Sequence, residues 1–277
     1  MTWQEIQIAV PGFTLAAKTT GNPDRPALLA LHGWLDNANS FDWLAALLPD
    51  YYFIALDLPG HGLSSHIPEG CHYHFSDGIF TILNCIKSLG LKKLHLLGHS
   101  MGACLASLVA GVQPNLFLSL ILIEGLGPFT SPADTACVQL RDYWNHQVPK
   151  TKAVKSYMSL EKAAQARARR GHVSYELAYK LCERGVRQSD QSYYWQHDRR
   201  LLIPSPLRMT EEQILSCLRQ ITAPTQLIWA KKGFDFDLGE VNGRMKAVKN
   251  LAVEFVEGGH HVHMEKPAEI AGLISNR

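Results

Sequence analysis

The strongest candidate for a reactive side chain is a serine flanked by glycines, in the run Gly98-His99-Ser100-Met101-Gly102. Residues 93–97 before it have the short apolar pattern of a buried strand, and residues 103–110 after it have the small, apolar pattern of a helix. A serine on such a sharp strand-to-helix turn exposes its hydroxyl at the top of a sheet, and flanking glycines avoid collisions there. We therefore predict that Ser100 is a nucleophile.

A serine hydroxyl is a weak nucleophile at neutral pH, so it needs a histidine to take its proton and a carboxylate to orient that histidine. Three histidines, His260, His261 and His263, lie together after residues 252–256, which have the pattern of a strand. They could also be considered as metal ligands, but no cluster of carboxylates or cysteines supports that reading. We therefore predict no metal site.

Taken together, four stretches resemble motifs of the α/β-hydrolase superfamily. Besides the serine turn, these are His32-Gly33-Trp34, residues 57–64 (Asp-Leu-Pro-Gly-His-Gly-Leu-Ser) and residues 259–267 (Gly-His-His-Val-His-Met-Glu-Lys-Pro). The chain is similar to capped serine hydrolase-like proteins, relatives of haloalkane dehalogenases and epoxide hydrolases that carry serine instead of aspartate at the turn. The resemblance implies an α/β-hydrolase fold: a mostly parallel eight-stranded sheet with helices on both faces and an inserted helical cap.

The resemblance also assigns roles to particular residues. His260 occupies the histidine position of the pattern Gly-His-x-x-x-x-Glu-x-Pro, so it is the predicted base. The backbone N–H groups of Trp34 and Met101 would stabilise the oxyanion that forms during acyl transfer. Asp57 and His61 would shape their turn without reacting.

The carboxylate departs from the commonest pattern. Many relatives have Trp-Gly-x-x-Asp after the seventh strand, whereas residues 229–233 here read Trp-Ala-Lys-Lys-Gly. Asp235 and Asp237 follow closely and are two candidates. The third is Glu124, which ends the sixth predicted strand and matches the position used in the haloalkane dehalogenase branch. Neighbouring strand ends of a parallel sheet face one crevice, so we favour Glu124, with Asp235 as the main alternative.

Strand and helix patterns alternate up to residue 127 and return at residue 223. Between about residues 130 and 220 there is no convincing strand, only polar segments of helical character. We predict a main domain over residues 1–127 and 223–277, and a helical cap over residues 128–222 inserted after the sixth strand. The cap region is rich in Lys and Arg, which indicates either a solvated helical surface or an anionic substrate or partner.

Composition excludes several other classes. The chain has 277 residues, 46% of them hydrophobic, and a net charge of only +2, so nothing favours binding to nucleic acid. Its six scattered cysteines contain no Cys-x-x-Cys pair, which indicates free thiols in a reducing compartment. No signal peptide and no apolar run long enough to span a membrane is seen, so we expect a cytoplasmic protein.

These features predict a serine hydrolase that cleaves carboxylic ester or related acyl bonds of a small, partly apolar substrate through an acyl-enzyme, with no cofactor. The same residues would also serve thioesterases, lactonases and carbon–carbon bond hydrolases, because the fold does not determine the substrate. A hydrolase-derived binding protein with slow turnover is a further alternative. Oligomeric state is not predicted.

Overall fold

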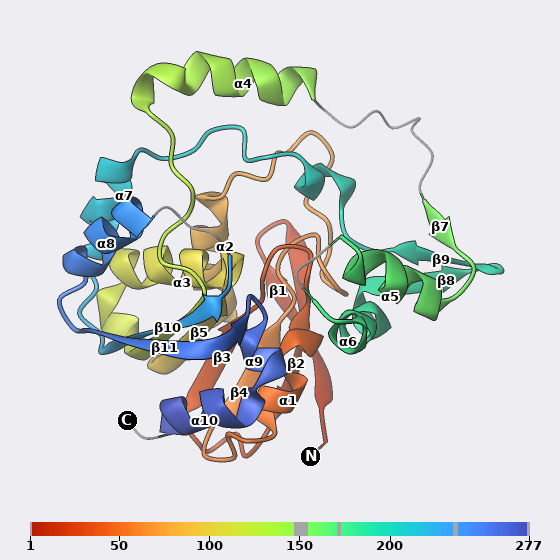
Figure 1. Cartoon of the computed structure of the whole chain (residues 1–277), viewed down its shortest axis with the longest axis horizontal. Helices are drawn as coiled ribbons and strands as arrows, with labels where there is room; N and C mark the ends of the chain where they lie inside the picture. The colour runs from red at the N-terminus through yellow and green to blue at the C-terminus, as the bar shows by residue number, and fades with distance from the viewer. Residues whose placement is uncertain (1, 147–154, 171–172, 235–237, 276–277) are drawn as a thin grey trace.

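An eight-stranded sheet forms the centre of the molecule (Figure 1). The computed structural model describes residues 2–146, 155–170, 173–234 and 238–275. The strand order is β1-β2-β4-β3-β5-β6-β10-β11, and only the pairings of β2 with β1 and with β4 are antiparallel. The strands are β1 (Gln4–Val10), β2 (Phe13–Thr20), β3 (Ala27–Leu31), β4 (Tyr52–Leu56), β5 (Leu94–His99), β6 (Phe117–Ile123), β10 (Thr225–Lys232) and β11 (Leu251–Gly259).

Helices cover both faces of this sheet, because its central strands are apolar on both sides. In β3, Leu29 and Leu31 point into one hydrophobic layer and Leu28 into the other, as the two-residue period of a strand requires. One layer contains α2 (Asp77–Ser88), α3 (Met101–Val112) and α7 (Glu211–Leu218), and α8 (Leu238–Ala247) adjoins it; the other contains η1 (Ala38–Phe41), α1 (Asp42–Ala45), α9 (Val262–Glu265) and α10 (Pro267–Ser275). The predicted fold class is confirmed.

The segment between β6 and α7 lies mostly outside this sandwich. It contains α4 (Ala136–Asn145), β7 (Ser156–Tyr157), α5 (Leu160–Ala168), α6 (Tyr175–Gly185), β8 (Val186–Ser189), β9 (Ser192–Trp195) and η4 (Arg199–Leu202). In Figure 1, α4 crosses above the main domain, whereas α5, α6 and the three short strands form a separate group beside it. That group has its own core, centred on Leu177, Leu181 and Cys182.

Two details of this segment differ from the expectation of a purely helical cap over residues 128–222. First, β7, β9 and β8 form a three-stranded antiparallel sheet, in which a tight turn at Asp190 joins β8 to β9 with a φ of 53°. The strands are too short and polar to show an alternating pattern. Second, α7 packs on α3 and places Ile214 and Leu218 in the main core. The part outside the main core therefore ends before α7.

Two further observations bear on the expectations from composition. All six cysteines are free thiols. Among the described residues, the structure contains no helix that is both long and apolar enough to cross a membrane.

Candidate active site

Ser100 lies on the sharp turn between β5 and α3, at the carboxyl end of the sheet. Its φ of 52° is unusual for a residue with a side chain, and its N–H donates to the carbonyl of Ile123 at 2.8 Å, which ties the turn to β6. A Cβ at Gly98 would overlap the carbonyl of Gly102, and a Cβ at Gly102 would overlap that of Leu31. Both glycines are therefore needed for the turn to pack against its neighbours.

The side chain of His260 reaches Ser100 from the loop after β11. Its Nε2 lies 2.9 Å from the Ser100 Oγ, within hydrogen-bond distance. The loop is closed by Glu265, whose carboxylate accepts a hydrogen bond of 2.7 Å from the N–H of Gly259. This bond gives a physical reason for the glycine and glutamate that flank the histidine in the sequence pattern.

Glu124, at the end of β6, holds the other side of the imidazole. Its Oε2 lies 3.0 Å from the His260 Nδ1, and the side chain is fully buried. The carboxylate also accepts backbone hydrogen bonds from Ala230 at 2.6 Å and Phe234 at 3.1 Å. These donors satisfy a buried charge that would otherwise be costly. Ser100, His260 and Glu124 thus form one continuous chain of hydrogen bonds.

The glycine at position 233 now has a structural explanation. A Cβ there would overlap the Glu124 carboxylate, which occupies the space beside β10 where the more usual aspartate would stand. Asp235 and Asp237, the alternative acids, lie outside the residues that the structure describes.

The two predicted oxyanion donors lie on adjoining segments. Met101 is the first residue of α3, so its N–H has no acceptor within the helix. Trp34 follows β3, which pairs with β5, and its indole N–H donates to the carbonyl of Leu201 at 2.9 Å.

Buried His32 holds the β3 loop in place: its Nε2 accepts from the N–H of Leu58 at 2.9 Å. Burial lowers the pKa of His32, in keeping with this acceptor role.

Asp57 is buried away from the histidine loop and bonds to structural groups. It accepts hydrogen bonds of 2.8 Å from the N–H groups of Ala38 and Leu63 and from the Arg184 Nε. Arg184 belongs to α6 and also contacts Glu5, so this cluster joins the inserted segment to the first strand.

The other two histidines of the C-terminal trio bind elsewhere. The His261 Nε2 lies 3.0 Å from an oxygen of Asp36, and the His263 Nε2 lies 2.7 Å from the Ser40 Oγ. Sequence reasoning missed Asp36 entirely, although it stands only two residues after Trp34 in the loop that follows β3. No signal in the sequence shows that this aspartate is buried, because its partners lie far away along the chain.

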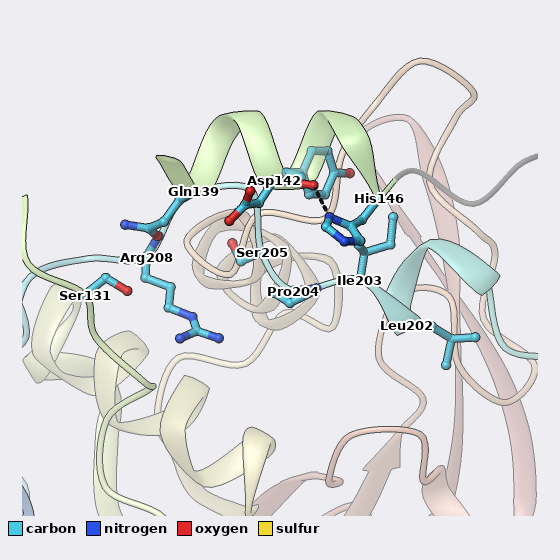
Figure 2. A pocket seen from close by; sticks show the side chains of 10 residues that line it. Ser131, Gln139, Asp142, His146, Leu202, Ile203, Pro204, Ser205 and Arg208 are labelled. Atoms are coloured by element: carbon cyan, nitrogen blue, oxygen red, sulfur yellow. Dashed lines mark hydrogen bonds between the residues drawn. The ribbon is translucent and has the colours of Figure 1, made fainter. Parts of the chain in front are cut away.

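A pocket of about 500 Å³ lies between α4 and the segment over residues 202–208. Figure 2 shows Gln139 and Asp142 on α4 above it, His146 directly after the helix, and the segment over residues 202–208 running beneath. The guanidinium of Arg208 stacks 5.9 Å from the ring centre of Phe129. None of the lining residues belongs to the hydrogen-bonded chain of Ser100.

Apolar side chains lead from this pocket toward His260. The rings of Phe129 and Phe234 are 6.2 Å apart, and those of Phe234 and His260 are 5.8 Å apart. Phe129, Phe234 and Trp34 are all exposed, which is unusual for such large side chains. The exposed surface beside His260 therefore suits an apolar group.

The fold and this arrangement define a member of the α/β hydrolases. A family model of the alpha/beta hydrolase fold matches residues 26–267, so the chain belongs to this family. Within it, the chain is 35% identical to a probable serine hydrolase of Drosophila melanogaster, over 99% of this chain and 87% of that protein. It is 33% identical to a serine hydrolase-like protein of Dictyostelium discoideum, over 95% of this chain and 78% of that protein.

A more distant curated relative is a monoacylglycerol lipase of Mus musculus, 27% identical over 90% of this chain and 74% of that protein. Among solved structures, a hypothetical protein from Pseudomonas aeruginosa PAO1 is 37% identical, with a TM-score of 0.91 over 99% of this chain and 97% of the other. A thioesterase domain from the curacin biosynthetic pathway is 26% identical, with a TM-score of 0.88 over the full length of both chains.

Proposed function

We propose that this protein is a serine hydrolase that cleaves carboxylic ester or thioester bonds through a covalent acyl-enzyme. The observation that carries the proposal is the chain of hydrogen bonds from Ser100 through His260 to Glu124, built on a turn that exposes the serine. The membership of the chain in a hydrolase family supports it.

In this mechanism the Ser100 Oγ attacks the acyl carbon while the His260 Nε2 takes its proton. The proton then goes to the leaving alcohol or thiol, and the acyl group remains on Ser100 as an ester. Water, deprotonated by His260, attacks this ester, and the same proton passes from His260 to the Ser100 Oγ as the bond breaks and the acid leaves. Glu124 stays ionised throughout, holds the Nδ1 proton and stabilises the imidazolium in each step.

The negative charge on the substrate oxygen is stabilised by the backbone N–H groups of Met101 and Trp34. Such fixed donors contribute a large share of the rate enhancement in acyl transfer, on the order of 10²–10³ for each donor. The N-terminus of α3 adds its positive dipole at the same place.

An apolar acyl chain is the favoured substrate group, because exposed Phe234 lies beside the ring of His260 and exposed Phe129 lies beside Phe234. We include thioesters as well as oxygen esters among the candidate substrates because a thioesterase domain is similar to this chain over its full length. We include lipid esters because a monoacylglycerol lipase is a relative. We also propose that the segment from residue 128 to the start of α7 acts as a cap that selects among these substrates.

The test is labelling with a fluorophosphonate, followed by a panel of acyl esters and acyl thioesters of increasing chain length. Ser100→Ala should lose labelling and about 10⁴-fold or more of the hydrolysis rate. Ser216→Ala, in an exposed position on α7, is the matched control and should behave like the parent. Undiminished hydrolysis by Ser100→Ala would refute the assignment.

A further inference from the structure

Asp36 connects the inserted segment to the loop that carries His260. The side chain is almost fully buried, and one carboxylate oxygen lies 3.0 Å from the His261 Nε2. The other oxygen forms an ion pair with Arg167, which belongs to α5 of the inserted segment. A single carboxylate therefore bridges α5 to the residue that follows the predicted base. Because the carboxylate is buried, losing either partner is costly, and the positions of all three groups are fixed relative to one another.

His99 adds a second connection between the serine turn and the same loop. Its Nε2 lies 2.8 Å from the carbonyl oxygen of His260, and since a carbonyl only accepts, this nitrogen carries the proton. The His99 Nδ1 is then bare, and it lies 3.8 Å from Asp36. Burial among neighbouring histidines holds the pKa of His99 well below its usual range, so the ring stays neutral.

The loop also packs on the inserted segment through an apolar side chain. Met264, four residues after His260, is buried in the core formed by α5 and α6, with Leu177 and Leu181. Beside it, the Asn37 side chain donates to the carbonyl of Leu181 at 2.8 Å. The loop is thus held on one side by the main domain and on the other by the cap.

Asp36, His99 and His261 are also close enough to be considered as metal ligands. However, the guanidinium of Arg167 already neutralises the same carboxylate, and a second cation beside it would be repelled. A positioning role fits the charges better than a metal site.

We propose that Asp36 and Arg167 are positioning residues for His260: their buried ion pair transmits the docking of the cap to the histidine loop and holds the imidazole in line with Ser100. This inference rests on the proposed function, because it assumes that His260 is the base. Without the ion pair, the loop loses its support from α5, and the imidazole spends less time in the reactive position.

The experiment compares Asp36→Asn and Arg167→Gln with Lys180→Gln in the full chain. Lys180 is the matched control, because it makes another ion pair between α6 and the main domain, to Asp42 and not to Asp36. Each protein is measured for its rate of fluorophosphonate labelling, for kcat and KM on a reactive acyl ester, and for the pH profile of kcat/KM. Thermal unfolding reports any loss of stability separately.

Asp36→Asn and Arg167→Gln should lower kcat about 10- to 100-fold with little change in KM, since misplacing a catalytic group by a fraction of an ångström costs rate. Their pH profiles should move in opposite directions. Asp36→Asn leaves a buried positive charge near the loop, which disfavours protonated His260 and moves the acidic limb to lower pH. Arg167→Gln leaves a negative charge and moves it to higher pH, each by about half a unit or more.

The ionisable groups that face this cluster are the same in every variant apart from the one replaced. They are Asp36, His99, Glu124, Arg167, His260, His261 and His263, together with His32 and His61, which interact with the charge of Asp36, and Cys182 and His197, which interact with that of Arg167. Arg167→Lys, which keeps the charge, should recover part of the lost rate, and added guanidinium should recover part of it in Arg167→Ala.

Parent-like kcat and pH profiles in both variants would overturn the proposal, as would equal losses in Lys180→Gln. A loss of folding without opposite pH shifts would also count against it. The proposed function fails in a distinguishable way, because the parent protein itself would then show no labelling of Ser100.

Discussion

Glu124 and Gly233 occupy one place in the active site: the carboxylate of the first stands where a side chain of the second would be. The two strand ends that carry them, β6 and β10, are neighbours in the sheet, and the Glu124 carboxylate reaches the His260 Nδ1 from the first of them. We therefore expect a carboxylate at position 233 to reach the same imidazole nitrogen from the second.

Exchange of the two side chains tests this relationship directly. Glu124→Gly alone should lower kcat about 10³-fold by removing the charge that stabilises the imidazolium. Adding Gly233→Asp should restore the rate to within about 10-fold of the parent, since the new carboxylate enters the vacated space and glycine tolerates the φ of 56° at position 124. Steady-state kinetics of both variants provide the measurement. A double variant as slow as the single one would disprove the idea of a shared location.

Charge, separate from shape, is tested by Glu124→Gln. The amide keeps the size of the side chain but not the charge, and we expect turnover to fall about 10²–10⁴-fold. Asp235→Asn should stay close to the parent. The reverse result, a normal turnover in Glu124→Gln and a strongly reduced turnover in Asp235→Asn, would place the acid after β10 instead.

Buried histidines should make the protein sensitive to acid. Burial lowers the pKa of His61 to about 3 and, together with the charge of Arg167, that of His197 to about 4. In the unfolded chain these histidines take up a proton near pH 6.5, whereas in the folded protein they stay neutral to much lower pH. Their contribution to stability is therefore complete above pH 6.5 and is lost as the pH falls toward their folded pKa values. Each such group contributes a slope of up to about 1.4 kcal/mol per pH unit.

Urea unfolding at pH 7, 6 and 5 measures this slope. His61→Asn should flatten it, because the side chain that replaces the imidazole does not titrate. An unchanged slope in this variant would show that His61 is accessible to protons in the folded state.

Five of the six cysteines should divide into two classes toward alkylating reagents. Burial raises the pKa of Cys85, Cys104 and Cys182 to about 12, and the thiolate is the reactive form. Cys71 and Cys137 are exposed. Iodoacetamide at pH 8 should therefore modify the exposed pair in the native protein and the three buried thiols only after unfolding. Mass spectrometry of peptides reads out the result, and early modification of Cys104 would indicate an opening beside the serine turn.

Much of this molecule could be predicted from its sequence, because the signals were local. The apolar strands and the glycines around Ser100 each reflect a packing constraint at their own position. The choice of Glu124 as the acid rests on the absence of a carboxylate at position 233 and on the resemblance to the haloalkane dehalogenase branch, and it stays a prediction.

What could not be predicted depends on contacts between distant segments. The short strands of the inserted segment are stabilised by one another and have no alternating pattern of their own. The membership of α7 in the main core depends on its contact with α3, and its amphipathic pattern fits either location. Asp36 gains its meaning only when Arg167 and His261, more than a hundred residues away, meet it.

The order of the strands has a consequence for how this protein becomes reactive during its synthesis. Ser100 and Glu124 belong to one continuous β5-α3-β6 unit, whereas His260 follows β11, the edge strand that is made after the other seven. A nascent chain can therefore assemble the proposed nucleophile and the proposed acid on a growing sheet before the proposed base has been made. We therefore expect the proposed hydrolysis to begin only when the last strand has joined the sheet.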